Sequence, residues 1–512
     1  MRRTGGTPIE PRPPINALLT AIEQRPAAVF AAFAALHLVV WTALPAALYP
    51  NLPLDLIEAL TYGREWQLGY DKLPPLPWWL VEVVHRVLGY DLFYYALAQA
   101  AVIAAFWLVW TMGRRLVGTT GALVSLLILD GLHYVHFTAA KFNHDVIQLP
   151  FWALAGLSFW LALRQGRTVH WALLGFAIGM ALWAKYFVLV LALPLGVFLV
   201  FDREARRHLM TPGPYVAVAV ALLVASPHLI WLVQNDFLPF RYADARAAPS
   251  RGVLDHVLHP VQFAIGQLAF ILPALAIALP LIFPRGDSAA QRTTTDFDRR
   301  IVTLLAFGPA VTVVALSFST GRGTIAMWGY PLWLFLGLWI VLVVGAALER
   351  VRLARLVTAW AIVFVGFAAA FFVSYAVLPS YDGRYRAVFF PGDQLGAEIS
   401  TRFRALTGRP LAYVVGTMWT GGNISHYAPE HPRVVIDGRP VRAPWIDLSD
   451  LYSKGAVVVW TEGDPRVLPP AFRSVAVDAE VQEPFTLPYR RGKGEVTVGW
   501  AVLRPRPAVA LR

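Results

Sequence analysis

Two carboxylates stand directly after the first long apolar run of the chain. Asp55 and Glu58 are three residues apart, and Leu54 to Leu68 has the pattern of a helix that lies on a membrane surface. At this spacing both side chains occupy neighbouring positions of one helix face. They could activate a hydroxyl group as a general base or bind a cation. Helix capping by Asp55 with a solvated Glu58 is the alternative interpretation.

A second candidate lies in the stretch WQLGYDKLPPLPWW. Lysine is scarce, because the 44 basic residues include only five lysines, at positions 72, 141, 185, 454 and 493. Lys72 follows Tyr70 and Asp71, and the prolines after it break the chain before a second predicted surface helix begins. An ammonium group at this place suits a phosphate. The alternative is an interfacial turn in which Lys72 snorkels and pairs with Asp71.

Polar residues gather again between the third and fourth apolar runs, in AAKFNHDVIQLPFW. Lys141, His144 and Asp145 crowd this predicted turn. Asp145 could cap the next helix, but a carboxylate at the edge of the hydrocarbon beside His and Lys is also a functional candidate. Upstream, Asp130, His133 and His136 lie on about one helical face of the predicted third span, a pattern that favours an interhelical polar network over a metal site.

Two further basic positions are candidates for anion binding. Arg322 stands between two glycines in STGRGT, on a predicted external turn where a head group could approach closely. Arg241 belongs to the loop 234–259, which also carries His256 and His259. Two histidines three residues apart can ligate a metal, but such a pair alone is weak evidence. A plain loop is the alternative for both segments.

Composition defines the class of protein around these motifs. The 512 residues are 57% hydrophobic and 15% charged, and apolar runs of about 20 residues recur from residue 27 to 378, so the chain is predicted to be a polytopic membrane protein. The net charge of +12 does not indicate nucleic-acid binding, because the arginines fall in short clusters between apolar runs, as in cytoplasmic loops. There is no cysteine, and no Walker A, Rossmann or HExxH motif occurs.

Alternating the basic clusters predicts the topology. Residues 1–26 form a cytoplasmic tail, 27–378 an all-α membrane bundle of about 11–13 helices, and 379–512 a small α/β domain on the external side. Spans are predicted at 27–48, 92–112, 119–138, 146–163, 213–233, 260–282, 301–319, 329–347 and 354–377. Residues 170–201 should form a short V-shaped pair with its tip near Lys185. Strands are predicted in LAYVVG, PRVVID, GAVVVW and VGWAVL.

With these motifs in place, the chain resembles glycosyltransferase family 39, membrane transferases of the GT-C fold that include protein O-mannosyltransferases and bacterial aminoarabinose transferases. The resemblance rests on the acidic pair, on the GYDKLPPL segment, and on Asp145 in FNHD followed by LPFWAL. It covers roughly residues 30 to 380. The acidic pair is often adjacent in the family, whereas two residues separate Asp55 from Glu58 here, which leaves open which of the two is the base.

The resemblance implies a function. The donor would be a sugar on a polyprenyl phosphate, the acceptor lipid A or lipopolysaccharide core, and the reaction inverting, on the periplasmic face of a bacterial inner membrane. Protein O-mannosylation and a lipid-linked sugar transporter or flippase are the alternatives. A divalent cation shared by Asp55, Glu58 and Asp71 is conceivable. The implied catalytic residues are Asp55, Glu58 and Asp145, and the implied substrate- and phosphate-binding residues are Tyr70, Lys72, His144, Lys141, Arg241 and Arg322, with Lys185 in reserve and Trp66, Trp78 and Trp79 beside the sugar or prenyl path.

Overall fold

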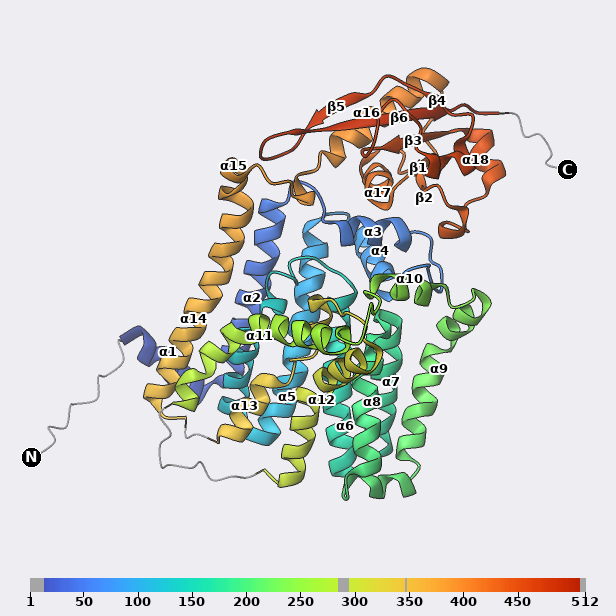
Figure 1. Cartoon of the computed structure of the whole chain (residues 1–512). Coiled ribbons are helices and arrows are strands. Elements are labelled where there is room, and N and C mark those ends of the chain that lie inside the picture. Colours follow the sequence, from blue (N-terminus) through green and yellow to red (C-terminus); the bar gives the residue numbers. More distant parts are fainter. Residues whose placement is uncertain (1–12, 284–293, 346–347, 507–512) are drawn as a thin grey trace, which may run out of the picture.

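The computed structural model describes residues 13–283, 294–345 and 348–506. A body of helices carries a small sheet domain at one end, and the chain passes from one to the other after α14 (Figure 1). The predicted N-terminal tail lies outside the described residues up to residue 12, as do Arg285 and Arg292 of one predicted basic cluster. The fold class is as predicted, an all-α membrane bundle with a C-terminal α/β part.

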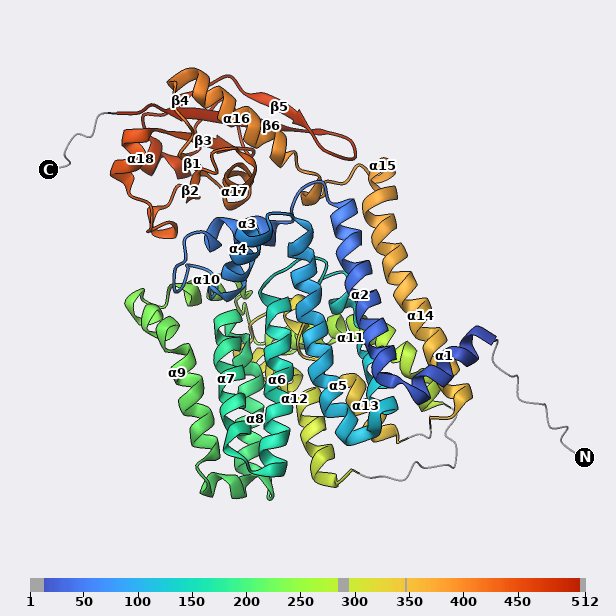
Figure 2. The same ribbon diagram turned by 180° about the vertical axis from the view of Figure 1, so that it is seen from behind.

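The helices of the body share high apolar content and run mostly along one axis (Figures 1 and 2). Seven of the described helices are long and apolar enough to cross a membrane, so the chain is a multi-pass membrane protein. The helical bounds are α1 Pro13–Gln24, α2 Pro26–Leu48, α5 Leu92–Leu129, α6 His144–Gln165, α7 Thr168–Ala184, α8 Leu189–Phe201, α9 Gly213–Gln234, α10 Leu238–Arg246, α11 Asp255–Ile282, α12 Asp296–Thr320, α13 Leu336–Val344, α14 Arg350–Phe372 and α15 Pro379–Asp382.

The helix α5 contains two of the predicted spans. Its regular backbone is interrupted at Gly118, which has a φ of 72° that glycine adopts without strain. The chain reverses there, because Gly113 on one side of the break packs directly against Ala122 on the other. The two predicted spans are therefore the arms of one hairpin, with Arg114 and Arg115 near its tip.

Two predicted spans are shorter in the structure. The span predicted to reach residue 138 ends at Leu129, because Gly131 passes so close to Ala274 of α11 that a Cβ would clash with backbone, and the chain turns there. The span predicted at 329–347 becomes a helix only from Leu336, since Pro331 interrupts the backbone hydrogen bonding before it. The V-shaped pair is confirmed: α7 ends at Ala184 and α8 begins at Leu189.

Two short helices lie between the body and the sheet domain (Figure 2). They are α3 Leu54–Gly63 and α4 Leu76–Leu88, as predicted for the surface helices. The left-handed Gly89 ends α4. Because Gly63 lacks a side chain, α3 packs with its last turn directly on the backbone of Trp78 in α4. The two helices thus form one rigid platform at the end of the bundle.

The C-terminal domain is a mixed sheet with helices on it. The strand order is β2-β1-β3-β6-β4, with β5 paired to β6; β1 runs parallel to β2 and β3, and β6 is antiparallel to β3. The predicted strands are all present. The bounds are β1 Tyr413–Gly416, β2 Arg433–Ile436, β3 Ala456–Trp460, β4 Glu480–Val481, β5 Phe485–Pro488 and β6 Glu495–Leu503, with helices α16 Gly392–Thr407, α17 Met418–Tyr427, α18 Leu448–Lys454 and α19 Arg473–Ala476.

Candidate active site

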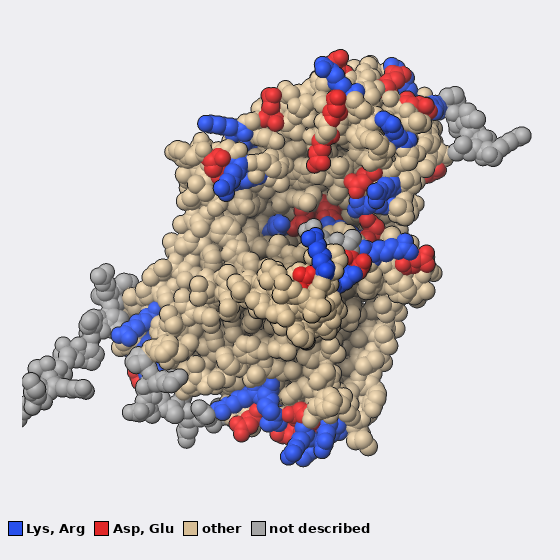
Figure 3. Space-filling view, in the orientation of Figure 1, with Lys and Arg blue, Asp and Glu red and all other residues tan. Residues whose placement is uncertain are grey.

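The body, the platform of α3 and α4, and α10 enclose a cavity of about 540 Å³. In Figure 3, charged side chains gather in a hollow between the helical body and the sheet domain, above a belt of the body that shows almost none. The charged and polar residues that line the cavity come from four segments far apart in the chain. These lining residues are Asp55, Glu58, Lys72, Lys141, Asn143, His144, Asp145, Lys185, Tyr186 and Tyr242.

Asp55 lies in the first turn of α3 and faces the loop before α6. Its Oδ2 atom is 2.9 Å from Nζ of Lys141 and accepts a hydrogen bond of 3.1 Å from Asn143. Burial raises the pKa of Asp55, but Lys141 and these hydrogen bonds outweigh burial and lower it to about 2. The Asp55 carboxylate is therefore ionised at neutral pH. The capping alternative does not describe it, because no side chain caps α3.

Glu58 lies one turn further along the same face, as its spacing predicted. Its Oε2 atom is 2.7 Å from Nζ of Lys72, and its side chain is 5% exposed. Burial raises the pKa of Glu58 against the opposing effect of Lys72. Lys72 also lies 5.4 Å from the ring centre of Tyr242 in α10. The alternative interpretation, in which Lys72 pairs with Asp71, is wrong, because the proline-bounded turn directs Lys72 into the cavity.

Asp145 forms the third ion pair, with Lys185 at the tip between α7 and α8. The distance from Nζ of Lys185 to Oδ1 of Asp145 is 2.5 Å, and Gln148 donates a hydrogen bond to the same oxygen. Asn143, not Asp145, caps α6. His144 lies 3.1 Å from the carbonyl oxygen of Pro74, edge-on to the ring of Trp78.

Three carboxylates and three lysines thus meet in one cavity, and each carboxylate pairs with one lysine. The three lysines are the ones that occur in the helical half of the chain, so lysine scarcity did mark residues that line one cavity. Their charges cancel in pairs, and each cation is held about 2.5 to 2.9 Å from its partner oxygen. A phosphate that enters the cavity would meet lysine ammonium groups that are already held in place. When a paired carboxylate takes up a proton, the positive charge of its lysine is no longer balanced and can stabilise the phosphate.

Three of the predicted substrate-binding residues lie elsewhere. Tyr70 is buried against Trp78 and donates a hydrogen bond to the backbone of Tyr62. Arg322 pairs with Asp244, and Arg241 is exposed; neither lines the cavity. The predicted loop 234–259 in fact contains the helix α10, which carries Arg241. For both arginines, sequence position did not indicate the direction of the side chain.

Asp71 also points away from the other carboxylates. Its oxygens accept hydrogen bonds from Tyr62 and from Arg442 of the sheet domain, both at 2.6 Å. Asp55, Glu58 and Asp71 therefore do not form a metal-ligating group among the described residues. Of the predicted aromatic lining, only Trp78 borders the cavity, and Trp66 stacks on Trp79 outside it.

Part of the cavity wall comes from distant segments that the sequence did not indicate. Tyr186 and Phe187 follow the predicted tip lysine, Tyr242 lies in α10, and Met327 and Trp328 come from the turn before α13. The mixed aromatic and polar character of the loop 234–259 was a signal for Tyr242, but nothing in the spacing placed that loop over the surface helices.

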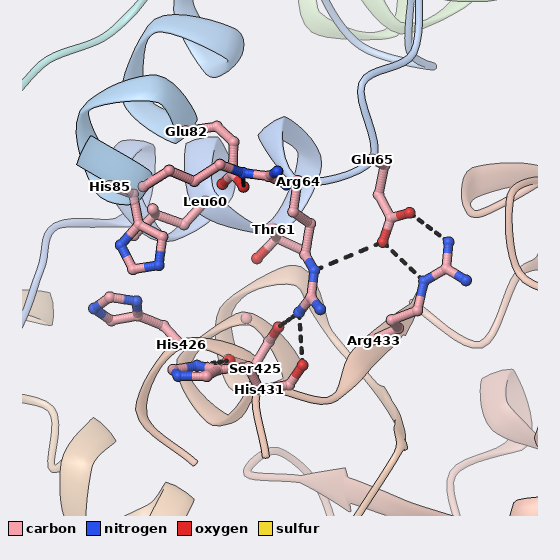
Figure 4. A pocket seen from close by; sticks show the side chains of 12 residues that line it. Leu60, Thr61, Arg64, Glu65, Glu82, His85, Ser425, His426, His431 and Arg433 are labelled. Carbon is pink, nitrogen blue, oxygen red and sulfur yellow. Dashed lines mark hydrogen bonds and ion pairs between the residues drawn. The ribbon is translucent and has the colours of Figure 1, made fainter. Parts of the chain in front are cut away.

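A second, more polar cavity of about 460 Å³ lies on the opposite side of α3, where the sheet domain meets the platform. Figure 4 shows Arg64 reaching from α3 to Ser425 and His431, and Glu65 paired with Arg433. His85 of α4 and His426 of α17 face one another there. These contacts attach the sheet domain to the helix that carries Asp55 and Glu58.

Comparisons with known proteins agree with this fold. Residues 72–231 match the family model described as dolichyl-phosphate-mannose-protein mannosyltransferase. The structure resembles that of the transferase ArnT from Cupriavidus metallidurans bound to undecaprenyl phosphate, with a TM-score of 0.59 at 14% identity over 95% of this chain and 98% of that chain. The chain therefore has the GT-C fold of ArnT, and it is a membrane glycosyltransferase.

Several curated proteins are similar in sequence to this chain. A lipopolysaccharide core galacturonosyltransferase of Rhizobium johnstonii is 25% identical over 93% of this chain and 97% of its own length. A lipid A galacturonosyltransferase of the same organism is 30% identical over 43% of this chain and 46% of its own. An undecaprenyl phosphate-alpha-4-amino-4-deoxy-L-arabinose arabinosyl transferase of Pseudomonas savastanoi pv. phaseolicola is 28% identical over 45% and 44%.

Proposed function

We propose that this glycosyltransferase moves a sugar from a polyprenyl phosphate to lipid A or the lipopolysaccharide core, with inversion, at the periplasmic face of a bacterial inner membrane. The observation that carries the proposal is the cavity in which Asp55, Glu58 and Asp145 each face a lysine. The full-length relation to a lipopolysaccharide core galacturonosyltransferase supports the acceptor and makes a uronic acid the first sugar to test.

In this proposal Asp55 is the base. It is ionised, lies in the cavity, and has a side chain 28% exposed, whereas Glu58 is enclosed. The acceptor hydroxyl gives its proton to Asp55, its oxygen attacks the anomeric carbon, and the bond from that carbon to the phosphate oxygen breaks. The proton neutralises Asp55, so the charge of Lys141 becomes available to the leaving phosphate as its negative charge grows.

Lys72 and Lys185 have separate places in this proposal. Lys72 lies between Glu58 and the ring of Tyr242, at a place where the donor phosphate can exchange for a carboxylate partner. Lys185 and Asp145 form the pair at the opposite wall. His144 packs edge-on against Trp78, which is itself buried against Tyr62, so this pair forms a fixed part of the cavity wall. The proposal includes a cytoplasmic N-terminus (1–26), a membrane catalytic domain (27–378) and a periplasmic sheet domain (379–512).

The decisive experiment is complementation of a deletion strain with the wild type, Asp55→Asn or Glu58→Gln, followed by mass spectrometry of lipid A and core. The wild type should restore a sugar that the deletion lacks. Asp55→Asn should lower transfer by about 10²- to 10⁴-fold, the usual contribution of a general base, at unchanged protein level in the membrane. An unchanged lipid A and core profile in the deletion strain would refute the acceptor, and full activity of both variants would refute the mechanism.

One observation favours a second acceptor class. The matched family model describes transfer of mannose to protein, and it covers the segment with Lys72, Lys141 and Lys185. A protein acceptor would leave lipid A and core unchanged in the deletion strain, while a sugar disappears from envelope proteins. A transporter is less well supported, because the charged residues that line the cavity lie at the end of the bundle next to the sheet domain and not near its middle.

A further inference from the structure

Three metal-ligating side chains meet in the interior of the helical body, outside the catalytic cavity. His37 lies in the middle of α2, Asp130 directly follows α5, and His136 follows the short turn His133–Val135. All three are at most 1% exposed. A carboxylate oxygen of Asp130 and one ring nitrogen of each histidine lie within 4.8 Å of one another. In the described part of the chain this is the only group of three such residues with that geometry.

The Asp130 carboxylate is aimed at the two histidines. Its Oδ2 atom accepts a hydrogen bond of 2.7 Å from the indole nitrogen of Trp360 in α14. Its Oδ1 atom lies 2.8 Å from Nδ1 of His37 and 3.6 Å from Nε2 of His136. The latter nitrogen also contacts the backbone carbonyl oxygen of Asp130, so a further oxygen borders the cluster.

Two ring nitrogens of this cluster lack the hydrogen bonds that burial demands. Nε2 of His37 and Nδ1 of His136 have no hydrogen-bond partner in the described structure. Aromatic rings surround them, including Trp41 and Phe364. A carboxylate in such a place within a membrane bundle is expensive unless a cation compensates it. Among the described residues, only the two histidines come within ion-pair distance of Asp130.

We propose that His37, Asp130 and His136 bind a divalent cation of the zinc type. Two imidazoles and a carboxylate are the ligands zinc takes in proteins, and a bound ion would satisfy atoms that are otherwise without partners. Trp360 holds the free carboxylate oxygen, which is the role of the outer hydrogen bonds that orient metal ligands. The ion fastens the segment after α5 to α2, and this segment leads within five residues to Lys141.

The site is structural, since the rings and helices around it leave no open face for a substrate. Its effect on the reaction is indirect, through the place of Lys141. The competing arrangement is an ion pair of Asp130 with a protonated histidine, which needs no metal. The proposal does not depend on the identity of the sugar or the acceptor, and its test reads metal content directly.

The test is elemental analysis of the full chain, purified in detergent with a tag other than polyhistidine. The wild type should hold about one zinc per chain, as a single structural site requires. His37→Gln and His136→Gln should lose it. His133→Gln is the matched control, because His133 lies in the same segment but stacks on Phe137 and is not part of the cluster. Equal metal content in all three variants would place the metal elsewhere and overturn the proposal.

A measurement on the wild type covers variants that fail to fold. Metal removed with a chelator and replaced by Co²⁺ should give the visible absorption of cobalt in a four-coordinate nitrogen and oxygen site, and removal should lower the midpoint of thermal unfolding. Wild-type protein that carries no zinc and shows no cobalt spectrum would overturn the proposal and favour the histidine ion pair. Because no step of transfer is measured, this result is independent of the proposed reaction.

Discussion

At the scale of single residues, the proposed catalytic cavity depends on ion pairs that are largely shielded from water. Each pair joins a lysine to a carboxylate in the wall of the cavity. Breaking one pair leaves a buried charge without a partner, which typically costs about 3 to 5 kcal/mol, whereas removing both charges together is often nearly neutral. Single and double variants therefore separate the structural role of a lysine from its role in binding the donor.

Lys72→Met tests this separation. The single variant leaves Glu58 unpaired, so both the thermal unfolding midpoint and the affinity for the polyprenyl-phosphate donor should fall. Lys72→Met with Glu58→Gln should recover the midpoint but not the affinity, which we expect to stay at least about tenfold weaker, the loss of one charge-assisted contact. Lys454→Met is the control, because Lys454 forms an exposed pair in α18. Recovery of donor affinity in the double variant would show that Lys72 has only a structural role.

The Asp55–Lys141 pair predicts the dependence of activity on pH. The pKa of Asp55 is about 2 in the folded chain, below its ordinary 3.8, so its stabilising effect is present above about pH 4 and is lost as the pH falls towards 2. Protonation of Asp55 should not limit the wild type between pH 5 and 7, by the same linkage. In Lys141→Met the burial that raises the pKa of Asp55 is unopposed by Lys141, so the acid limb of kcat/KM should move upward.

The control for this prediction is Lys141→Arg, which keeps the cation and should keep the wild-type profile. A Lys141→Met enzyme that retains activity with an unshifted acid limb would show that Asp55 is not the base. A Lys141→Met enzyme whose maximum rate falls without a shift would instead assign Lys141 to the leaving phosphate alone.

At the scale of elements, the platform of α3 and α4 places the carboxylates of one helix against the loop that holds Lys72. Gly63 makes this possible: a Cβ there would lie 2.4 Å from the backbone oxygen of Trp78, which cannot move without α4. Gly63→Ala should therefore force the two helices apart, destabilise the fold by about 1 to 3 kcal/mol, and lower activity although no reacting group changes.

Gly366→Ala is the matched control for Gly63→Ala. Gly366 lies within α14, and a Cβ there meets no atom within 4 Å. Alanine favours a helix by about 1 kcal/mol over glycine, so this variant should be as stable as the wild type or more so. Thermal unfolding and transfer assays on both variants check the prediction; a Gly63→Ala enzyme with wild-type rate would mean that the spacing of α3 and α4 does not control the site.

The elements were more predictable than their contacts. Hydropathy located the spans and strands, because burial in lipid or in a sheet imposes long apolar runs, and lysine scarcity located three residues of the cavity. The direction of Arg322 and the partner of Asp71 were not predictable. Asp71 pairs with Arg442, 371 positions away, and no local periodicity encodes a contact of that separation. Asp130 and His136 do meet, but through a turn and not along a helix.

At the scale of the whole molecule, the sheet domain holds the platform of α3 and α4 in place. Arg442 donates a hydrogen bond of 2.6 Å to Asp71 and also pairs with Asp437 of its own domain. Asp71 is adjacent to Lys72, so the sheet domain fixes the backbone that directs this lysine into the cavity. Arg433 and Arg64 add contacts on the other side of α3. We therefore expect the domain to affect the reaction although it does not line the cavity.

Arg442→Met should loosen the attachment of the sheet domain to the platform. The change leaves Asp71 and Asp437 without their cation, so we expect transfer to fall by at least about tenfold, corresponding to 1.4 kcal/mol, and proteases to cut faster at the exposed connection Tyr381 to Tyr385. Arg466→Met is the control, because Arg466 pairs with Glu483 in full contact with solvent and should matter little. Combining Arg442→Met with Asp71→Asn removes the unpaired carboxylate and should restore protease resistance in part. Wild-type activity in Arg442→Met, with unchanged cleavage, would show that the platform holds its shape alone.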